Sequence, residues 1–397
     1  MKILQINTIY PNGSTGKIAA EIKKLCGENG IECKIACRYQ SKNQRTKDTY
    51  AVSSYLDCHI HNRLAKINMK QGKYSKFKTL LFLRKIKKYN PDIIHLHNIH
   101  GSFINHKILF NFIKNNHIKV VWTLHDCWCM TGGCTHFDMV GCEKWKIQCE
   151  KCPQKGKAYI DASAKMQKNK KNWFSGIEEM MITTPSNWLR DLVKQSFLKD
   201  YPVKVINNGI DLSIFKPTDS NFREKYNIKD KFILLGVAFG WGERKGLDVF
   251  IELSKRLDET FQIVLVGTDE RVDKLLPKNI ISIHRTQNQI ELAEIYSASD
   301  LFVNPTREEN FPTVNIETLA CGTPIVTFKT GGSPEIIDDN CGIVVEKNDV
   351  DAMIEKVKFV CEEKPFLKEN CVKRASLFNS EEKFKEYIEL YKSLMGR

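Results

Sequence analysis

The amino-acid sequence predicts an α/β protein made of two doubly wound domains, each with a parallel sheet that helices cover on both faces. Two observations support this fold class. Short apolar runs bounded by turn residues alternate with stretches of helical periodicity, which is typical of βαβ units. The chain of 397 residues also exceeds the size at which a single hydrophobic core stops growing, so two domains are expected.

The apolar runs fall into two sets that a polar segment separates. The first set of expected strands covers residues 2–7, 33–37, 92–97, 119–125 and 179–185. The second set begins after Pro202 and covers residues 232–238, 262–267, 301–305, 324–328 and 342–346.

The polar segment between the sets, VKVINNGIDLSIFKPTDSNF, is rich in Asn, Gly, Asp and Pro. This composition is typical of a connection between domains. We therefore expect one domain at residues 1–207, a second at 208–379, and a closing helix at 380–397 that returns to the first domain.

Doubly wound sheets bind ligands at the carboxyl ends of their strands, so the residues after each run are candidates for a site. After the first run, Gly13 and Gly16 permit a tight turn into a helix that begins near Lys17. Its backbone N–H groups could approach an anionic or hydroxyl-rich ligand, although a purely structural turn explains the glycines equally well. A dinucleotide site is not supported, because G-x-G-x-x-G is absent and Arg38 follows the second run in place of an acidic residue.

His125 and Asp126 close the fourth run. A histidine there can hydrogen-bond a sugar hydroxyl or transfer a proton near neutral pH. On this residue alone, a buried histidine that completes the sheet is the favoured explanation. His95 and His97, in the third run, pose the same choice with weaker support.

Arg244 and Lys245 lie directly before a helix that we expect to begin near Leu247. Cations are unfavourable at a helix N-terminus, because the helix dipole is positive there. A bound diphosphate would remove this conflict. Two exposed basic residues in a loop are the alternative.

The segment REENFPTVNIETLACGTP, at residues 307–324, places Glu309 in a loop and Glu317 in the helix that follows. Pro312 marks the start of this helix and Gly322 its end. Backbone N–H groups of its first turn would face the same anionic group as the basic pair. A carboxylate one turn further in can accept from two neighbouring hydroxyls, as on a ribose.

In this order along the chain, these features resemble the retaining glycosyltransferases of family 4, which have the two-domain GT-B fold. The resemblance extends over nearly the whole chain and rests on the glycine turn at 12–16, His125–Asp126, NNGID at 207–211, Arg244–Gly246, LVG at 265–267 and the Glu309-x7-Glu317 pair. It implies two Rossmann-like domains that face across a cleft, with a nucleotide-sugar donor on the second domain and the acceptor on the first.

The resemblance also implies roles for the candidate residues. Glu317 would hold the nucleotide ribose, Glu309 would contact the donor sugar, and Lys245 would bind the donor diphosphate. His125 would contact the sugar from the first domain, and Gly16 belongs to the loop that would approach the donor.

The sequence departs from the family pattern at two places. Asn310 stands where the family has glycine before Phe311, and both residues are expected to present backbone amides to the donor. Ala238 and Phe239 stand where the family has an arginine after the first strand of the second domain, so Arg244 is the expected substitute at the diphosphate.

The implied reaction moves a hexose-type sugar from UDP or GDP with retention of the anomeric configuration. The leaving diphosphate would take the acceptor proton on the same face, while Lys245 offsets the growing phosphate charge. No cofactor is expected for catalysis, and no Asp-x-Asp metal site is present. The base is expected near residues 281–287, where side chains do not distinguish uridine from guanosine.

Six of the fourteen cysteines lie within the 26 residues of the segment 127–152. Four of them have the spacing Cys134-x7-Cys142-x6-Cys149-x2-Cys152, and C-x2-C is a common half of a tetrahedral zinc site. A structural zinc that clips a lid beside the active site is favoured modestly over free thiols or disulfides. Cys127 and Cys129 are expected to pack beneath this loop.

The formal charge is +14, and residues 61–90 hold ten cations interleaved with apolar residues and no acidic residue. This composition suits an anionic membrane surface, and a solvated helix face is about as good an explanation. No span, signal peptide or nucleic-acid motif accompanies it. We therefore expect a cytoplasmic protein at the inner membrane face, with a glycan or lipid-linked oligosaccharide acceptor of cell-surface polysaccharide synthesis and no nucleic-acid partner.

Two other functions remain open at this point. A glycan phosphorylase has a similar architecture and would depend on free phosphate. A non-catalytic protein that binds nucleic acid or membranes would also explain the positive charge, but it would be expected to lack Glu309 or Lys245.

Overall fold

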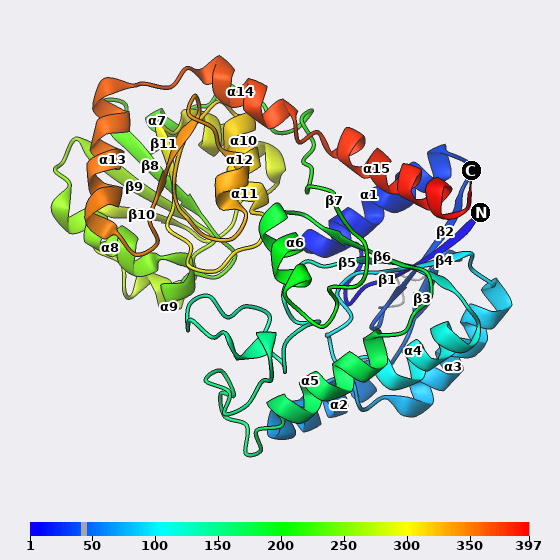
Figure 1. The fold of residues 1–397 in the computed structure, drawn as a ribbon. Coiled ribbons are helices and arrows are strands. Elements are labelled where there is room, and N and C mark those ends of the chain that lie inside the picture. The colour runs from blue at the N-terminus through cyan, green and yellow to red at the C-terminus, as the bar shows by residue number, and fades with distance from the viewer. Residues whose placement is uncertain (41–45, 397) are drawn as a thin grey trace. The chain divides into compact units, whose positions relative to one another are not determined.

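The computed structural model describes residues 1–40 and 46–396 of the chain, which form two compact units. The N-terminal unit comprises Met1–Ile206 together with Lys383–Arg397, and the C-terminal unit comprises Asn207–Glu382. Each unit is built on one parallel sheet (Figure 1), which confirms the predicted fold class.

The sheet of the N-terminal unit has seven strands in the order β3-β2-β1-β4-β5-β6-β7. They are β1 (Lys2–Ile6), β2 (Glu32–Cys37), β3 (Thr49–Ala51), β4 (Ile93–Leu96), β5 (Lys119–Thr123), β6 (Met180–Thr184) and β7 (Val203–Val205). The five apolar runs all form strands. The two edge strands β3 and β7 were not predicted, because three residues are too few to give an apolar pattern.

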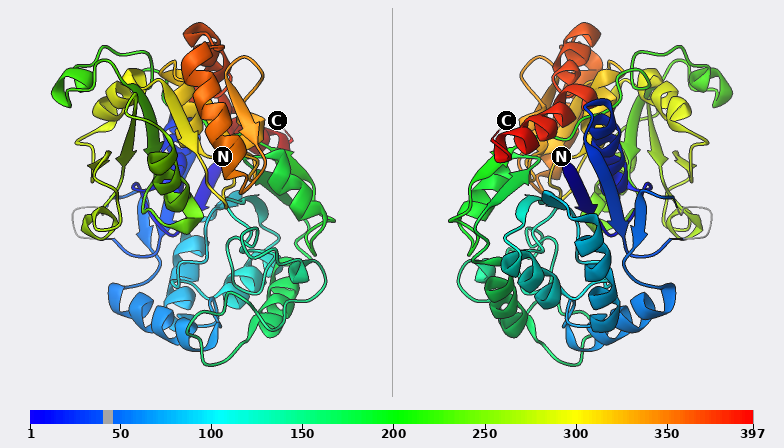
Figure 2. Two further views of the ribbon diagram at one scale, coloured as in Figure 1. Left: turned by 90° about the vertical axis from the view of Figure 1, so that its left-hand side faces the viewer. Right: turned by 90° about the vertical axis from the view of Figure 1, so that its right-hand side faces the viewer.

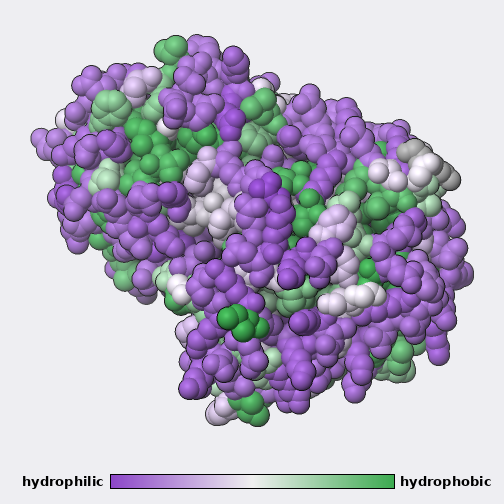
Figure 3. Space-filling model, viewed as in Figure 1, coloured by the Kyte–Doolittle hydropathy of each residue, from purple (hydrophilic) through white to green (hydrophobic). Residues whose placement is uncertain are grey.

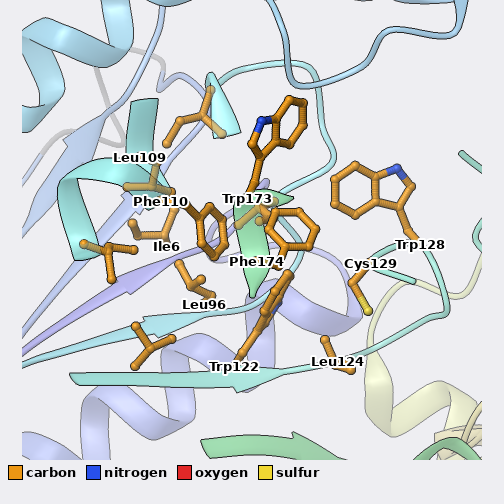
Figure 4. Packing of buried hydrophobic residues seen from close by; sticks show 14 of the residues in the cluster. Ile6, Leu96, Leu109, Phe110, Trp122, Leu124, Trp128, Cys129, Trp173 and Phe174 are labelled. Carbon is orange, nitrogen blue, oxygen red and sulfur yellow. The ribbon is translucent and has the colours of Figure 1, made fainter. Parts of the chain in front are cut away.

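Helices cover both faces of this sheet. They are α1 (Ser14–Glu28), α2 (Tyr55–Asn68), α3 (Lys76–Tyr89), α4 (His106–Asn115), α5 (Ser163–Phe174), α6 (Asn187–Lys194) and α15 (Ser380–Leu394). On one face, α1 and α15 lie side by side (Figure 2) and pack on alternate strand residues such as Ile3 and Val121. On the other face, residues such as Trp122 pack against α4 and α5 around Phe110 and Phe174 (Figure 4). This alternation follows from the two-residue period of a strand.

The sheet of the C-terminal unit has six strands in the order β10-β9-β8-β11-β12-β13. They are β8 (Phe232–Val237), β9 (Phe261–Val266), β10 (Ile280–Ile283), β11 (Leu301–Asn304), β12 (Ile325–Phe328) and β13 (Gly342–Val345). Its helices are α7 (Phe222–Lys225), α8 (Leu247–Arg256), α9 (Glu270–Asp273), α10 (Gln289–Ala298), α11 (Thr313–Ala320), α12 (Ser333–Ile336), α13 (Val350–Glu363) and α14 (Lys368–Ser376). The edge strand β10 was not predicted.

In both sheets the strand order reverses beside the first strand of the unit. The chain runs outward from β1 to β3 and then resumes on the other side at β4, and β8 and β11 are related in the same way. Loops that leave such neighbouring strands diverge, which opens a crevice at their carboxyl ends. Each unit therefore has one edge where a ligand is expected. None of the helices in the described ranges combines the length and the apolar character that crossing a membrane requires.

Candidate active site

In the C-terminal unit, the loops after β8 and β11 meet at the expected edge. The loop after β8 ends in a single 3-10 turn, Glu243–Lys245, followed by Gly246 and α8. Gly246 has φ +75, and a Cβ there would lie 2.5 Å from Cγ of Pro305, the residue after β11. Only glycine permits this close approach. Lys245 is thereby held against the loop that carries Glu309.

Lys245 and Glu309 form an ion pair, with 2.6 Å between Nζ and Oε2. Their side chains are 18% and 23% exposed, so the pair is partly shielded from solvent. A charge-assisted hydrogen bond of this kind is stronger than a neutral one and holds both side chains in place. The two residues for which the family resemblance implies contact with the diphosphate and the donor sugar therefore lie together.

The backbone of residues 309–311 is fixed from two sides. Gly331 has φ +55, and a Cβ there would come within 1.9 Å of the Glu309 carbonyl oxygen. The N–H of Gly332 donates to the Asn310 carbonyl at 2.7 Å, and the Asn208 side chain donates to the Phe311 carbonyl at 3.2 Å. The N–H of Asn310 donates to Oε1 of Glu309 at 3.1 Å, so this amide holds the carboxylate.

Glu317 lies in α11, which begins at Thr313 as predicted. The hydroxyl of Tyr296, on α10, donates to Oε2 of Glu317 at 3.1 Å. Burial and the neighbouring charge of Glu317 raise the pKa of Tyr296 well above its ordinary value, so the phenol remains a donor. Tyr296 was not predictable from the sequence, because an aromatic residue in a helix is usually a core residue.

Arg307 is a second residue that sequence reasoning missed. Its guanidinium makes a bidentate pair with Asp248 at 2.7 and 2.6 Å and donates to the Glu243 carbonyl at 2.5 Å. Its backbone N–H donates to the Arg244 carbonyl at 2.9 Å. Arg307 thus ties the Lys245 loop to the Glu309 loop, whereas the Arg244 side chain is exposed and reaches the Glu308 carbonyl only at 3.4 Å.

In the N-terminal unit, His97, His100, His125 and Asp126 line a small pocket at the carboxyl ends of β4 and β5. His97 is buried, with Nδ1 at 3.1 Å from Nε2 of His125 and Nε2 at 2.9 Å from Oε1 of Gln5. These histidines differ in their exposure. His95 is entirely buried between Tyr391 and Thr123, while His125 is half-buried and faces the pocket.

The hydrogen bonds of Gln5 determine where His125 carries its proton. Gln5 Nε2 lies 3.0 Å from the Ala19 carbonyl, which only accepts, so Gln5 Oε1 must accept from His97 Nε2. Neutral His97 then accepts at Nδ1, and His125 donates from Nε2. Burial, together with the charge of His100, lowers the pKa of His125 to about 4, so the ring is neutral at pH 7.

Asp126 pairs with His100, with 2.8 Å between Oδ2 and Nε2, and accepts from the Trp128 N–H at 2.9 Å. Burial alone would raise the pKa of Asp126, but the charge and hydrogen bond of His100 outweigh it and hold this pKa below its ordinary value. The carboxylate therefore stays ionised beside His125.

The first glycine turn differs in detail from the expectation. The helix α1 begins at Ser14, not near Lys17, because Gly13 with φ +72 forms its N-cap. Gly16 is therefore buried in the first turn, where a Cβ would lie 3.1 to 3.3 Å from backbone atoms of Pro11 and Ile9. Its small size permits the close packing of this turn.

The cysteine segment does not show the predicted zinc site. All fourteen cysteines are free, and Cys134, Cys142, Cys149 and Cys152 line one pocket beside Phe137 and Trp145. Nevertheless, within residues 1–40 and 46–396 no three side chains of His, Cys, Asp or Glu converge closely enough to hold a metal ion.

Other interactions hold this segment in place. Phe137 stacks on Trp145 at 4.9 Å, the buried ammonium of Lys170 donates to the Trp128 and Thr131 carbonyls, and Cys149 accepts from the Gly132 N–H at 3.2 Å. Cys127 and Cys129 are buried beneath the loop, as expected.

Comparison with known families gives two matches that together cover most of the chain. The sequence profile described as Glycosyltransferase Family 4 matches residues 16–214, and the profile described as Glycosyl transferases group 1 matches residues 218–378. A protein of Escherichia coli (strain K12), provisionally named colanic acid biosynthesis glycosyl transferase WcaC, is 21% identical over 99% of this chain and 100% of its own length. The capsular polysaccharide biosynthesis glycosyltransferase CapM of Staphylococcus aureus is 23% identical over 42% of this chain and 48% of its own length.

Solved structures share the same architecture. Sucrose-phosphate synthase from Thermosynechococcus elongatus superposes with a TM-score of 0.73 at 17% identity, covering 100% of this chain and 99% of its own. The Anabaena protein Alr3699/HepE in complex with UDP superposes with a TM-score of 0.71 at 15% identity, covering 99% of this chain and 100% of its own. At these identities the similarity shows the fold.

Proposed function

This chain belongs to glycosyltransferase family 4, of the bacterial polysaccharide-biosynthesis type, and we propose that it transfers a hexose-type sugar from a nucleoside diphosphate sugar to a glycan acceptor. The observation that carries the proposal is the Lys245–Glu309 ion pair at the carboxyl edge of the C-terminal sheet. In this pair, the Lys245 ammonium would bind the donor diphosphate and the Glu309 carboxylate would accept from a hydroxyl of the donor sugar.

The donor would lie along this edge. Glu317, held by Tyr296, would accept from the two ribose hydroxyls, and Lys245 would bind the diphosphate. The complex of the Anabaena protein with UDP-glucose supports a donor of this class. Asn310 and Phe311 would shape the pocket around the sugar through their fixed backbone. His125 would offer Nδ1 as an acceptor to a sugar hydroxyl, because its Nε2 proton is donated to His97.

The proposed reaction retains the anomeric configuration. The acceptor oxygen bonds to the anomeric carbon as the bond from that carbon to the diphosphate oxygen breaks. The acceptor proton passes to the departing phosphate oxygen on the same face. Lys245 would stabilise the negative charge that grows on the diphosphate in the transition state, where such stabilisation has the largest effect on rate.

The acceptor in this proposal is a lipid-linked oligosaccharide of cell-surface polysaccharide synthesis, reached at the cytoplasmic face of the membrane. The relatives named for colanic acid and capsular polysaccharide biosynthesis support this class of product. The ten cations without a carboxylate at residues 61–90 support an anionic surface nearby.

Thermal unfolding with UDP, GDP, ADP and their common sugar conjugates tests the donor class. A ligand at 100 times its dissociation constant adds about 2.7 kcal/mol to the free energy of unfolding. We expect one nucleotide to stabilise the wild type, and Glu317→Ala to abolish the effect through loss of the ribose contact. Glu252→Ala is the matched control, because this carboxylate lies on α8 at a half-buried position and pairs with Lys255. Stabilisation that survives Glu317→Ala would remove the assigned role.

A further inference from the structure

A third hollow lies in the N-terminal unit, between α2 and residues 154–158. Its volume is about 350 Å³, within the range of small-molecule sites. Its polar lining consists of three cations and three side-chain amides, namely Lys66, Lys155, Lys157, Asn62, Gln71 and Gln154. No carboxylate is among the described side chains that line it. The hollow therefore has the chemistry of an anion site.

The segment that contains the lining residue Gln71 is also rich in lysine. Lys73, in the loop after α2, has its pKa lowered by burial and by the charges of Lys165, Lys70, Lys107 and Lys76. Lys73 is thus repelled by four other ammonium groups. Asp161, the acidic group beside Lys155, is already bonded to the backbone N–H groups of Cys152 and Ser163 at 2.7 and 2.9 Å.

An exposed apolar stripe runs along the adjacent face of the same helix. Leu56, Ile60, Leu64 and Ile67 recur at helical spacing on α2 and are 68%, 52%, 37% and 41% exposed. The Ile67 carbonyl accepts from the N–H groups of Tyr159 and Ile160, whose side chains are 87% and 53% exposed. The stripe therefore continues onto the segment that closes the hollow. On the face drawn in Figure 3, hydrophilic residues predominate and hydrophobic residues form small separate patches.

We propose that this hollow and stripe together bind a lipid-linked acceptor, with its diphosphate head group among Lys66, Lys155 and Lys157 and its hydrocarbon chain on the stripe of α2. The proposal rests on the proposed function, since it assigns the acceptor site of that reaction. A concave cationic hollow suits a compact head group. The row of exposed aliphatic side chains beside it suits an alkyl chain, which a free phosphate or a glycan lacks.

Binding of farnesyl diphosphate to the full chain, measured by titration calorimetry beside inorganic pyrophosphate and farnesol, tests the site. We expect farnesyl diphosphate to bind more tightly than either fragment. Lys66→Gln, Lys155→Gln and Lys157→Gln combined should weaken it about a hundredfold, at about fivefold per cation. The matched triple Lys85→Gln, Lys87→Gln and Lys88→Gln on α3 removes the same charge outside the hollow and should change the affinity less than about threefold.

The stripe has its own test. Ile60→Ser, Leu64→Ser and Ile67→Ser combined should reduce farnesyl diphosphate affinity to that of pyrophosphate, while pyrophosphate binding stays unchanged. These side chains are exposed, so the variant is expected to fold.

Three results would overturn the proposal. The wild type could bind farnesyl diphosphate and pyrophosphate with equal affinity, both lysine triples could lose the same farnesyl diphosphate affinity, or Lys245→Ala could lose that affinity. The last would place the lipid diphosphate in the donor site. Nucleotide stabilisation, measured on the same variants, separates failure of this site from failure of the transferase function.

Discussion

Lys245 and Glu309 are the residues on which the chemistry proposed for the C-terminal unit depends. Each is held from more than one direction: Lys245 by Gly246 and the carboxylate, Glu309 by the ammonium and the Asn310 amide. Such a pre-organised cation would stabilise charge as it develops on a leaving diphosphate without further rearrangement.

Replacing Lys245 with alanine should lower kcat by about a hundredfold to a thousandfold, the usual cost of removing one group that stabilises developing charge. Lys255→Ala removes the same charge from an exposed position of α8 and is the control. Initial rates with the identified donor measure both. Comparable rates for the two variants would refute the role of Lys245.

The tautomer of His125 follows from hydrogen bonds that begin at Gln5. We expect His97 and His125 both to carry the proton on Nε2, which long-range ¹H–¹⁵N correlation spectra of the imidazole rings report. Gln5→Leu should abolish this preference and lower the free energy of unfolding by about 1–3 kcal/mol, because His97 loses a buried partner. A wild-type His125 protonated on Nδ1 would contradict the assignment.

At the scale of elements, the apolar runs were sufficient to predict ten strands, because buried parallel strands are nearly continuous in apolar residues. The edge strands β3, β7 and β10 are short or partly exposed and gave no such pattern. The helix start at Thr313 was predictable from Pro312, since proline suits the beginning of a helix.

Contacts across the sheet were not predictable in the same way. Arg307 meets Asp248 from 59 positions away, and His97 meets Gln5 from 92 positions away. Strand order brings these pairs together, and no local pattern encodes it. The cysteine spacing, in contrast, predicted a contact that the described part of the chain does not contain. The spacing fits zinc ligands, but in a loop without regular strands it does not determine whether the thiols converge.

Gly331 shows how one element supports another. Gly331→Ala forces a Cβ to within 1.9 Å of the Glu309 carbonyl oxygen, in addition to the strain of φ +55. We expect donor affinity to fall at least tenfold, as the loop that carries Glu309 shifts. Gly176→Ala, with φ +76 and open space around it, carries the backbone strain alone and should leave donor affinity unchanged. Calorimetry compares the two, and equal affinities would show that the loop tolerates the shift.

At the scale of the whole molecule, the N-terminal unit has a concentration of buried neutral histidines. Burial lowers the pKa of His61 and His125 to about 4 and that of His106 to about 3. An unfolded chain would protonate them near pH 6.5. Between these values the unfolded state binds more protons, so the native state loses stability as the pH falls.

The free energy of unfolding should therefore decrease as the pH falls from about 6.5 to 5, by at most about 1.4 kcal/mol per pH unit for each such histidine. Urea unfolding followed by tryptophan fluorescence measures the slope. His106→Gln should reduce the slope of unfolding free energy against pH by the contribution of about one bound proton. His59→Gln, at an exposed position, should leave this slope unchanged. A flat profile between pH 6.5 and 5 would contradict the neutral burial of these rings.

The central claim is that the chain transfers a sugar from a nucleoside diphosphate sugar to an acceptor. Phosphorus and proton NMR of the purified protein with a panel of UDP- and GDP-sugars and a lipid-linked glycan extract test it most directly. We predict that one donor is converted to its nucleoside diphosphate without added phosphate, and that the anomeric coupling of the product matches that of the donor. No turnover from any nucleotide sugar, or turnover only with inorganic phosphate, would contradict the account.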